Sequence, residues 1–270
     1  MEVKGDLEQE KIIDSLQTWF EENDKLPNKI DRVLLTRFYY CMQKDVEKTQ
    51  KLLETNYSMR FDNAYIFADR DPTDEDTENT LAFADIIPLP GLTPQSYRVM
   101  IHRINSSDPK MIHHAQDTKT YMLLADTRFS LPDAVIDGVP VLAKGDVHVT
   151  DMACHTMGHM RQMSFRVLRA MVKFLQEAYP IRIRAIHLIN CPSYMNKIMS
   201  IIRPFVNKRV FEVMHFHTDG LDGLYEHIPK EMLPEEYGGN AGTIPELKKK
   251  VVATMMEKRD YLMDPDYWSR

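Results

Sequence analysis

The sequence predicts an α/β fold in which an all-helical N-terminal unit is followed by a domain with a mainly parallel sheet. Two observations carry this prediction. Apolar residues recur at helical spacing through the first part of the chain, and from Tyr97 onward strand-like segments alternate with helical ones. Alternating strands and helices favour parallel pairing, because each parallel connection needs a crossover segment.

The first part of the chain is expected to form three helices. The first ends before Pro27 and carries one apolar stripe. That stripe consists of Ile12, Ile13, Leu16, Trp19 and Phe20. Asp31 and Asp45 are the expected N-caps of the next two helices, because a carboxylate can accept from the free N–H groups of a first turn. Residues 69–79 are acidic, contain a proline and lack periodicity, so a loop or linker is expected there.

Strand and helix patterns then alternate. The segment YRVMIHRI, which begins at Tyr97, is rich in β-formers and predicts a strand. Residues 139–147 and 210–216 are expected to be extended, and residues 121–125 and 165–178 to be helical. A terminal helix is expected after Gly239. Its apolar face consists of Leu247, Val251, Thr254, Met255 and Tyr261, and its solvated face of Lys248, Lys249 and Lys250.

The most informative segment runs from Tyr179 to Val206. Pro180 and the Asn190-Cys191-Pro192 turn bound a short apolar run, which favours a strand inside a sheet. This run consists of Ile181, Ile183, Ile186, Leu188 and Ile189. A helix follows in which one stripe is apolar, formed by Met195, Ile198, Met199, Ile202, Phe205 and Val206. Its polar side carries Asn196, Lys197, Ser200 and Arg203. Such a stripe is usually ordinary core, and the alternative is a movable cover over a ligand.

Composition narrows the class of protein. The chain has 270 residues and a formal net charge of −6, which argues against a general nucleic-acid binder. Its apolar runs are far short of a membrane span, and residues 1–14 are acidic and do not resemble a secretory signal, so a cytoplasmic location is expected. Cys41, Cys154 and Cys191 are expected to be free thiols.

Motifs for catalysis are missing from the sequence. There is no Gly-x-Ser-x-Gly elbow, phosphate loop or Gly-x-Gly-x-x-Gly fingerprint. His155 and His159 would share a helical face beside Cys154, but two ligands do not make a metal site, so a structural or exposed role is expected. His215 and His217 are expected to share one face of a strand. We therefore expect a non-enzyme with no catalytic residues, no metal and no cofactor.

The order of several sequence segments carries a resemblance. AIHLIN, which ends at Asn190, precedes the proline turn, the apolar helix, RPFVNKRVFEVMHFH and IPKEMLPEEYGG. DRVLLTRFYYCMQKDVEKTQKLL lies near the front and KRDYLMDPDYW near the end. This order resembles the CRAL-TRIO family of lipid-binding proteins, and within it the tocopherol- and retinaldehyde-transfer group. The resemblance implies a helical unit over residues 1–80, a CRAL-TRIO domain with a hydrophobic pocket and a lid helix over residues 81–242, and a C-terminal helix and tail over residues 243–270.

The resemblance also implies binding residues. The implied ligand-binding positions are Tyr121, Ala125, Met171, Phe174, Leu175, Tyr179, Ile181, Ile183, Ile186, Ile198, Ile202 and Val206. Plain core packing is an equally good interpretation for most of them. Tyr121 and Ala125 stand where tocopherol-binding relatives carry serines, so another apolar ligand is expected. The implied phosphoinositide-binding residues are Arg182, Arg184, Lys208 and Arg209, with Val213 at a position that is basic in relatives. Internal salt bridges are the alternative role for these arginines.

The expected function is intracellular binding of one small hydrophobic ligand and its transfer between membranes. The ligand classes considered are a retinoid, tocopherol, another isoprenoid or a phospholipid. The expected partners are that ligand and, transiently, a membrane surface that contains phosphoinositides; no nucleic acid is expected. The alternative is a lipid-sensing adaptor that binds a protein partner and transfers nothing.

Overall fold

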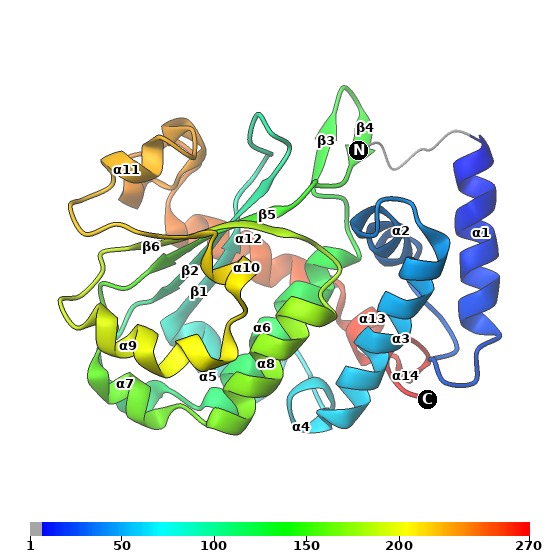
Figure 1. The fold of residues 1–270 in the computed structure, drawn as a ribbon, viewed down its shortest axis with the longest axis horizontal. Coiled ribbons are helices and arrows are strands. Elements are labelled where there is room, and N and C mark those ends of the chain that lie inside the picture. Colours follow the sequence, from blue (N-terminus) through cyan, green and yellow to red (C-terminus); the bar gives the residue numbers. More distant parts are fainter. Residues whose placement is uncertain (1–6) are drawn as a thin grey trace.

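A five-stranded sheet forms the centre of the protein in a computed structural model that describes residues 7–270 (Figure 1). The first six residues, part of the acidic N-terminal stretch, lie outside this description. The strand order is β1-β2-β5-β6-β7, with bounds Ala84–Pro88, Arg98–Ile104, Asp146–Asp151, Ile183–Ile189 and Met214–Phe216. The last four strands pair in parallel, and β1 pairs antiparallel with β2. The α/β prediction is therefore confirmed, including the interior position of β6.

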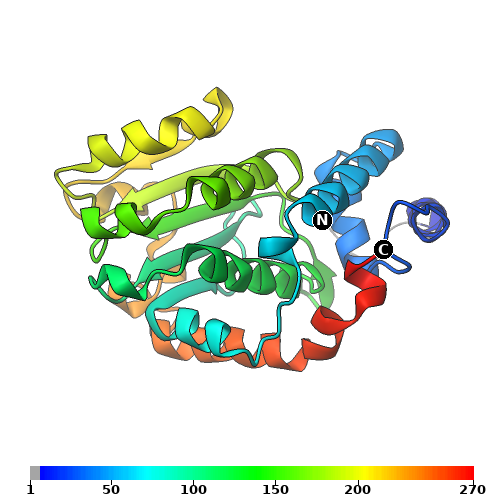
Figure 2. The ribbon, with the colours of Figure 1, turned by 90° about the horizontal axis from the view of Figure 1, so that it is seen from below.

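Helices cover both faces of this sheet. One face packs against α6 (His114–Phe129), α7 (Met157–Gln162), α8 (Phe165–Glu177) and α9 (Met195–Ile202), with α5 (Glu75–Phe83) beside α6 (Figure 2). The opposite face buries Val99, Val147 and Ile189 against α11 (Asp222–Tyr225), the segment with η3 (Lys230–Met232) and η4 (Glu235–Tyr237), and α12 (Ile244–Glu257). Alternate residues of each strand thus serve two separate cores. A small hairpin, β3 (Ala134–Ile136) with β4 (Val139–Val141), stands apart from the sheet.

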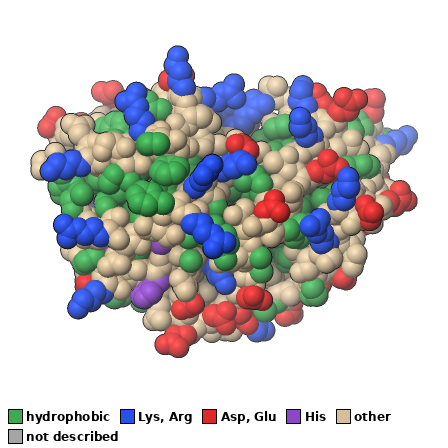
Figure 3. Space-filling model, turned by 60° about the horizontal axis from the view of Figure 1, so that its bottom comes forward, with side chains coloured by type: hydrophobic (Ala, Val, Ile, Leu, Met, Phe, Trp, Pro, Cys, Tyr) green, Lys and Arg blue, Asp and Glu red, His purple; other side chains and the backbone are tan. Residues whose placement is uncertain are grey.

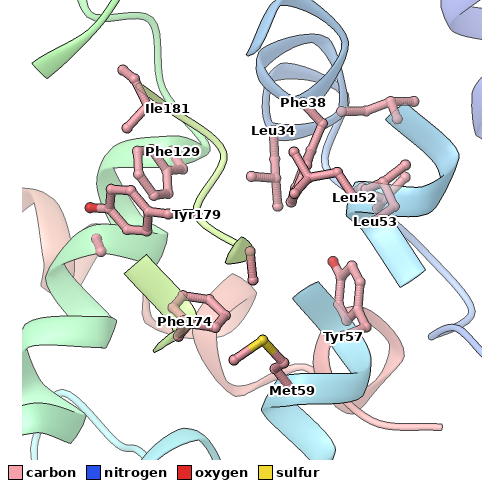
Figure 4. Close-up of a cluster of buried hydrophobic side chains, with 14 of the residues drawn as sticks. Leu34, Phe38, Leu52, Leu53, Tyr57, Met59, Phe129, Phe174, Tyr179 and Ile181 are labelled. Atoms are coloured by element: carbon pink, nitrogen blue, oxygen red, sulfur yellow. The ribbon is translucent and has the colours of Figure 1, made fainter. Parts of the chain in front are cut away.

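The N-terminal unit consists of α1 (Leu7–Glu21), α2 (Arg32–Cys41), α3 (Val46–Asp62) and α4 (Ala64–Phe67). Both predicted N-caps are confirmed, because Asp31 accepts from the backbone N of Leu34 and Asp45 from that of Lys48, each at 3.0 Å. The unit packs against α6 and α8 through a large apolar cluster, the junction core (Figure 4). The last helices, α13 (Arg259–Met263) and α14 (Pro265–Trp268), return beside it (Figure 1).

A buried ion group also joins the N-terminal unit to the domain. Asp126 on α6 is 1% exposed and accepts hydrogen bonds from Arg60 at 2.5 and 2.9 Å and from Arg70 at 2.7 Å. Burial raises the pKa of Asp126, but the two guanidinium groups outweigh it, so the net pKa is lowered. The carboxylate is therefore charged in the folded protein and holds residues from two parts of the chain to α6.

Four details differ from the sequence predictions. The acidic stretch 69–79 is only partly a loop, because α5 begins at Glu75 and acidic side chains stabilise a helix start. Residues 210–216 are not one strand, since Asn207 caps the short helix α10 (Lys208–Phe211) by accepting from Val210 N. Strand β1 lies before the first predicted strand. The expected terminal helix is divided at Lys258 into α12 and α13.

Two further sequence expectations concern cysteines and membrane spans. Cys41, Cys154 and Cys191 are free cysteines. Among residues 7–270, no helix combines the length and apolar character that crossing a bilayer demands.

Candidate functional site

The amphipathic segment after β6 folds as α9 followed by the turn η2 (Arg203–Phe205), and we call residues 195–205 the lid, after the role that the sequence predicts for them. Met195 and Ile198 are buried, whereas Asn196, Lys197 and Ser200 are exposed. The predicted apolar stripe is therefore confirmed. Asn190 makes the turn into this segment possible, because it adopts a left-handed φ of 52° and its side chain donates to Asp151 Oδ1 at 2.8 Å.

The lid packs against the sheet through an apolar group that we call the lid cluster. Its buried members are Met152, Leu188, Met195 and Ile198. Half-buried side chains complete it: Met157, Met160, Ile186, Cys191, Tyr194, Met199, Ile202 and Met214. Methionine side chains are flexible and fill irregular spaces, so this interface can adapt its shape more easily than one made of branched residues. Figure 2 shows α9 at one edge of the helical layer, next to α7 and α8.

Polar contacts hold both ends of the lid. At its start, the Tyr194 hydroxyl donates to the backbone O of His155. At its end, the side chain of Gln176 on α8 donates to Phe205 O at 3.1 Å and accepts from Asn207 N at 2.7 Å. The Phe205 ring also stacks on Phe165 with centroids 6.2 Å apart. The lid is thus fastened by a few contacts at its two ends and by apolar packing between them.

Apolar side chains are also exposed around the lid. A groove of about 670 Å³ lies beside α9, with Met195, Met199, Phe211 and Phe216 among its lining residues. In Figure 3, hydrophobic side chains gather over the half of this face that holds α7, α8 and α9, with Lys and Arg side chains around them. An apolar area ringed by basic residues is typical of a surface that meets a membrane or a hydrophobic partner.

The expected ligand-binding residues fall into two groups. Those of the first belong to the junction core: Tyr121, Ala125, Phe174, Tyr179 and Ile181 are buried in it, and Met171 and Leu175 pack against it. Those of the second belong to the lid cluster: Ile198, Ile186 and Ile202. Ile183 and Val206 are half-buried and belong to neither cluster. In Figure 4, Phe174, Tyr179 and Ile181 share a core with side chains of the N-terminal helices.

A pair of histidines that no pattern in the sequence indicated lies on the lid side of the sheet. His102 on β2 and His148 on β5 stack at 5.0 Å, and His102 Nε2 lies 2.8 Å from His148 Nδ1. Burial, and for His102 the neighbouring His148, lowers the pKa of each to about 3, so both are neutral. The Tyr121 ring lies 5.7 Å from His102, and His148 Nε2 is buried without a hydrogen bond, 3.9 Å from Asp146 Oδ2. This face therefore carries a neutral polar pair beside the ion pair of Asp146 and Arg128.

Two of the four expected phosphoinositide-binding residues lie in one cleft. Arg182 and Arg184 line a pocket of about 310 Å³, together with Arg37 and Lys44 from the N-terminal unit and Lys144 before β5. No acidic side chain of the described residues lines this pocket. We call it the basic cleft, and its charge suits an anion. Lys44 and Lys144 were not predicted, because only the tertiary fold brings them beside β6.

The other two expected residues lie outside the basic cleft. Lys208 and Arg209 are exposed on α10, and the Lys208 amine lies 3.7 Å from the Glu212 carboxylate. Val213, at the position that is basic in relatives, is half-buried and accepts a hydrogen bond from Ile186 N at 2.8 Å. The structure thus separates the predicted basic set into a cleft pair and a surface pair.

The histidines considered as metal ligands have other contacts. His159 Nδ1 accepts from Thr156 N at 2.9 Å and closes the capping box of α7, which is a structural role. His215 and His217 do share a face, and both stack against buried His187 at 4.8 and 5.2 Å. Among residues 7–270, no group of three or more His, Cys, Asp or Glu side chains is arranged to hold a metal ion.

Comparisons with known proteins agree with this architecture. The family model of the CRAL/TRIO domain matches residues 84–239, and that of the Pinta-like UBA domain matches residues 6–77. The human protein named alpha-tocopherol transfer protein-like is 24% identical over 224 residues, which cover 83% of this chain and 63% of the relative. Clavesin-2 from Mus musculus is 29% identical over 107 residues, which cover 40% of this chain and 33% of its own. The chain therefore spans less than two thirds of the length of these relatives.

A solved structure is similar over almost the whole chain. The crystal structure of Sfh5 superposes with a TM-score of 0.53 over 96% of this chain and 99% of its own, at 14% sequence identity. At that identity the likeness concerns the fold. It extends over the N-terminal helices as well as the sheet domain.

Proposed function

The chain belongs to the CRAL-TRIO family, and from this premise we propose that it binds one small hydrophobic ligand beneath the lid and carries that ligand between membranes. The single observation that supports this most is the lid cluster. A helix with one apolar stripe lies on a methionine-rich surface and is fastened by a few contacts at its ends. Such an interface can part without breaking a ladder of hydrogen bonds.

The energetics favour release at a membrane. Each buried methylene contributes roughly 0.8 kcal/mol, so opening the lid in water costs several kcal/mol for its exposed stripe. Against a bilayer, lipid tails cover the same stripe and the cost falls. Leaving the protein is likewise more favourable for the ligand at a bilayer than in water, because its apolar body is shielded from water both beneath the lid and among lipid tails. A retinoid, tocopherol, another isoprenoid or a phospholipid fits this chemistry, and a cytoplasmic site of action stays a prediction.

We also propose that phosphoinositides assist release through the basic cleft. Arg182 and Arg184 sit at the start of β6, the strand that leads into the lid, and Arg37, Lys44 and Lys144 add charge around the same pocket. A phosphorylated headgroup bound there would place the protein on an anionic membrane. Lys208 and Arg209 on α10 are exposed and would add a second, surface contact.

One observation favours the alternative role of an adaptor. The N-terminal helices match a family model of their own, the Pinta-like UBA domain, rather than the CRAL/TRIO model. A unit of this kind can bind a protein partner, in which case lipid occupancy would control docking. An adaptor would bind ligand and leave exchange between vesicles unchanged.

The test combines ligand identification with transfer. The purified chain is extracted with organic solvent, and mass spectrometry should show one apolar compound near equimolar amount. Exchange of a fluorescent lipid between vesicles should then accelerate with the protein. Ile198→Asp and Ile202→Asp should abolish loading, whereas the matched variant Lys197→Asp, on the exposed side of α9, should not. An empty protein that also fails to take up lipid from vesicles would contradict the proposal.

A further inference from the structure

A buried ionic network lies at the amino ends of the strands. The Asp133 carboxylate forms ion pairs with Arg37 at 2.5 Å and with Arg128 at 3.0 Å. Arg128 also forms an ion pair with Asp146, at 2.6 Å. Arg98, at the start of β2, donates from Nη1 to the backbone O of Asp133. This network holds three guanidinium groups and two carboxylates, so its members carry one excess positive charge. An uncompensated charge in the interior is costly unless another partner is supplied.

Arg37 also has a buried Nε without a hydrogen bond, but it pairs with Asp133, whereas Arg98 is the guanidinium of this network without a carboxylate partner. It forms no ion pair with a carboxylate of the described residues, and its Nε is buried without a partner. Its Nη2 also makes no hydrogen bond within residues 7–270. Burial, followed by the like charge of Arg128, lowers the pKa of Arg98 to about 10, so it remains charged at neutral pH. Nε and Nη2 share the edge of the guanidinium that can bind a carboxylate with two parallel hydrogen bonds, and because Nε is shielded from solvent, both bonds form once the side chain shifts toward its cavity.

A cavity of about 260 Å³ lies at this arginine, between α6, α12 and the turn after β1. Arg98, Arg128 and Lys250 supply its charge, and no carboxylate of the described residues lines it. Its walls are otherwise mainly apolar, with Pro90, Leu124, Pro132, Leu247 and Val251 among them. The cavity shares no residue with the lid cluster or the basic cleft.

We propose that this cavity is a second binding site, which takes a small carboxylate with an apolar body. The carboxylate binds the free edge of Arg98, the apolar body fills the space between α6 and α12, and Lys250 approaches the anion from the rim. A single carboxylate matches the one excess charge of the network and the one free edge. A phosphate dianion would bring a second charge and more acceptors than this edge can serve.

Octanoate is the probe for this site, measured with the full chain by calorimetry and by thermal denaturation. Two comparison compounds serve as controls: octan-1-ol has the same alkyl chain without the charge, and inorganic phosphate has negative charge without an alkyl chain. We expect octanoate to bind and to raise the unfolding midpoint, and both comparison compounds to bind at least about tenfold more weakly. Arg98→Gln should weaken the binding of octanoate by a similar factor, and Lys250→Glu should also weaken this binding.

Two further variants keep the test decisive. Thr254→Trp fills the cavity from α12 without touching the ionic network and should abolish octanoate binding even if Arg98→Gln folds poorly. Ile198→Asp disrupts the lid and should leave octanoate binding unchanged, so failure of the lid proposal is recognised separately. Equal affinity for octanol and octanoate, or undiminished octanoate binding in Thr254→Trp, would overturn the second site.

Discussion

The side chain of Gln176 accepts a hydrogen bond from the backbone N of Asn207 at 2.7 Å, two residues beyond the end of the lid. The same amide donates to Phe205 O at 3.1 Å, so a single side chain serves both a donor and an acceptor of the backbone. Gln176 therefore fixes the end of the lid to α8. An amide is suited to this because it carries a donor and an acceptor side by side.

Gln176→Ala should loosen the lid without unfolding the domain. Two hydrogen bonds of about 1 kcal/mol each are lost, which shifts the equilibrium toward the open lid by about thirtyfold. Stopped-flow exchange of a fluorescent lipid between vesicles should accelerate accordingly. Lys173→Ala is the matched control, because Lys173 lies on the same helix and is exposed. Equal exchange rates in the two variants would show that Gln176 does not restrain the lid.

The basic cleft predicts which residues make exchange sensitive to phosphoinositides. Arg182→Ala with Arg184→Ala removes two of the cations that line the cleft and should abolish the acceleration caused by phosphoinositide-containing acceptor vesicles. Lys208→Ala with Arg209→Ala should reduce it only partly, because these residues lie outside the cleft. Exchange to neutral vesicles is the internal control. A larger effect of the α10 pair would place headgroup binding on α10 instead.

Acid should weaken the fold through buried neutral histidines. His187 is 0% exposed, and burial, followed by His215, His227 and His217, lowers its pKa to about 3. Because the unfolded chain binds a proton near pH 6.5 and the folded one does not, stability is complete above that pH and falls as pH decreases toward 3. Between pH 6.5 and 5 the loss at His187 is about 2 kcal/mol.

Urea denaturation at pH 7 and pH 5 measures this effect. The free energy of unfolding should be lower at pH 5, and His187→Gln should reduce the difference, whereas His113→Gln, at an exposed position, should not. His102 and His148 contribute with the same sign, since their pKa values are also lowered to about 3. A protein equally stable at both pH values would exclude this account.

Asp126→Asn should strongly destabilise the attachment of the N-terminal unit. The substitution keeps the shape of the side chain but leaves Arg60 and Arg70 buried without their counter-charge, which typically costs about 3–5 kcal/mol. Asp14→Asn is the comparison, because its pair with Arg32 is exposed and such pairs contribute about 0–1 kcal/mol. Chemical denaturation of both variants provides the measurement, and similar losses would contradict the buried-pair explanation.

Gly239, the last residue of the segment IPKEMLPEEYGG, should not tolerate a side chain. A Cβ there would overlap the backbone O of Leu233 and lie 2.5 Å from that of Lys230, and backbone atoms cannot move aside easily. Gly239→Ala should therefore cost more than about 2 kcal/mol. Gly91→Ala is the control, since its Cβ meets nothing within 4 Å and only the positive φ of 76° opposes it, at about 1 kcal/mol. Thermal midpoints that fall equally would refute the steric argument.

Local patterns in the sequence predicted much of the fold. The stripe of the lid, the N-caps Asp31 and Asp45 and the interior strand β6 follow from the spacing of apolar residues and from cap chemistry, which act between near neighbours. Strand β1 was missed because it is short and its pairing partner lies in β2. The prediction of a single strand over residues 210–216 was wrong, because their alternating pattern also fits a short helix capped by Asn207 and a strand after it.

The site was less predictable because it depends on distant contacts. Phe174 and Tyr179 were grouped with the lid residues by resemblance, yet both pack in the core shared with the N-terminal helices, more than a hundred residues earlier in the chain. The His102–His148 pair also arises only when β2 and β5 become neighbours, although each strand shows a central histidine in the sequence. Long-range pairing of this kind leaves no periodic trace.

The outer strands of the sheet bear on self-association. At one border, β7 has only three residues, and at the other, β1 ends at Pro88 and packs against α12. A short or covered border offers few unpaired N–H and C=O groups to a strand from another molecule. Even if the lid opens as proposed and exposes its apolar stripe, the protein thus offers few strand edges that could start cross-β aggregation.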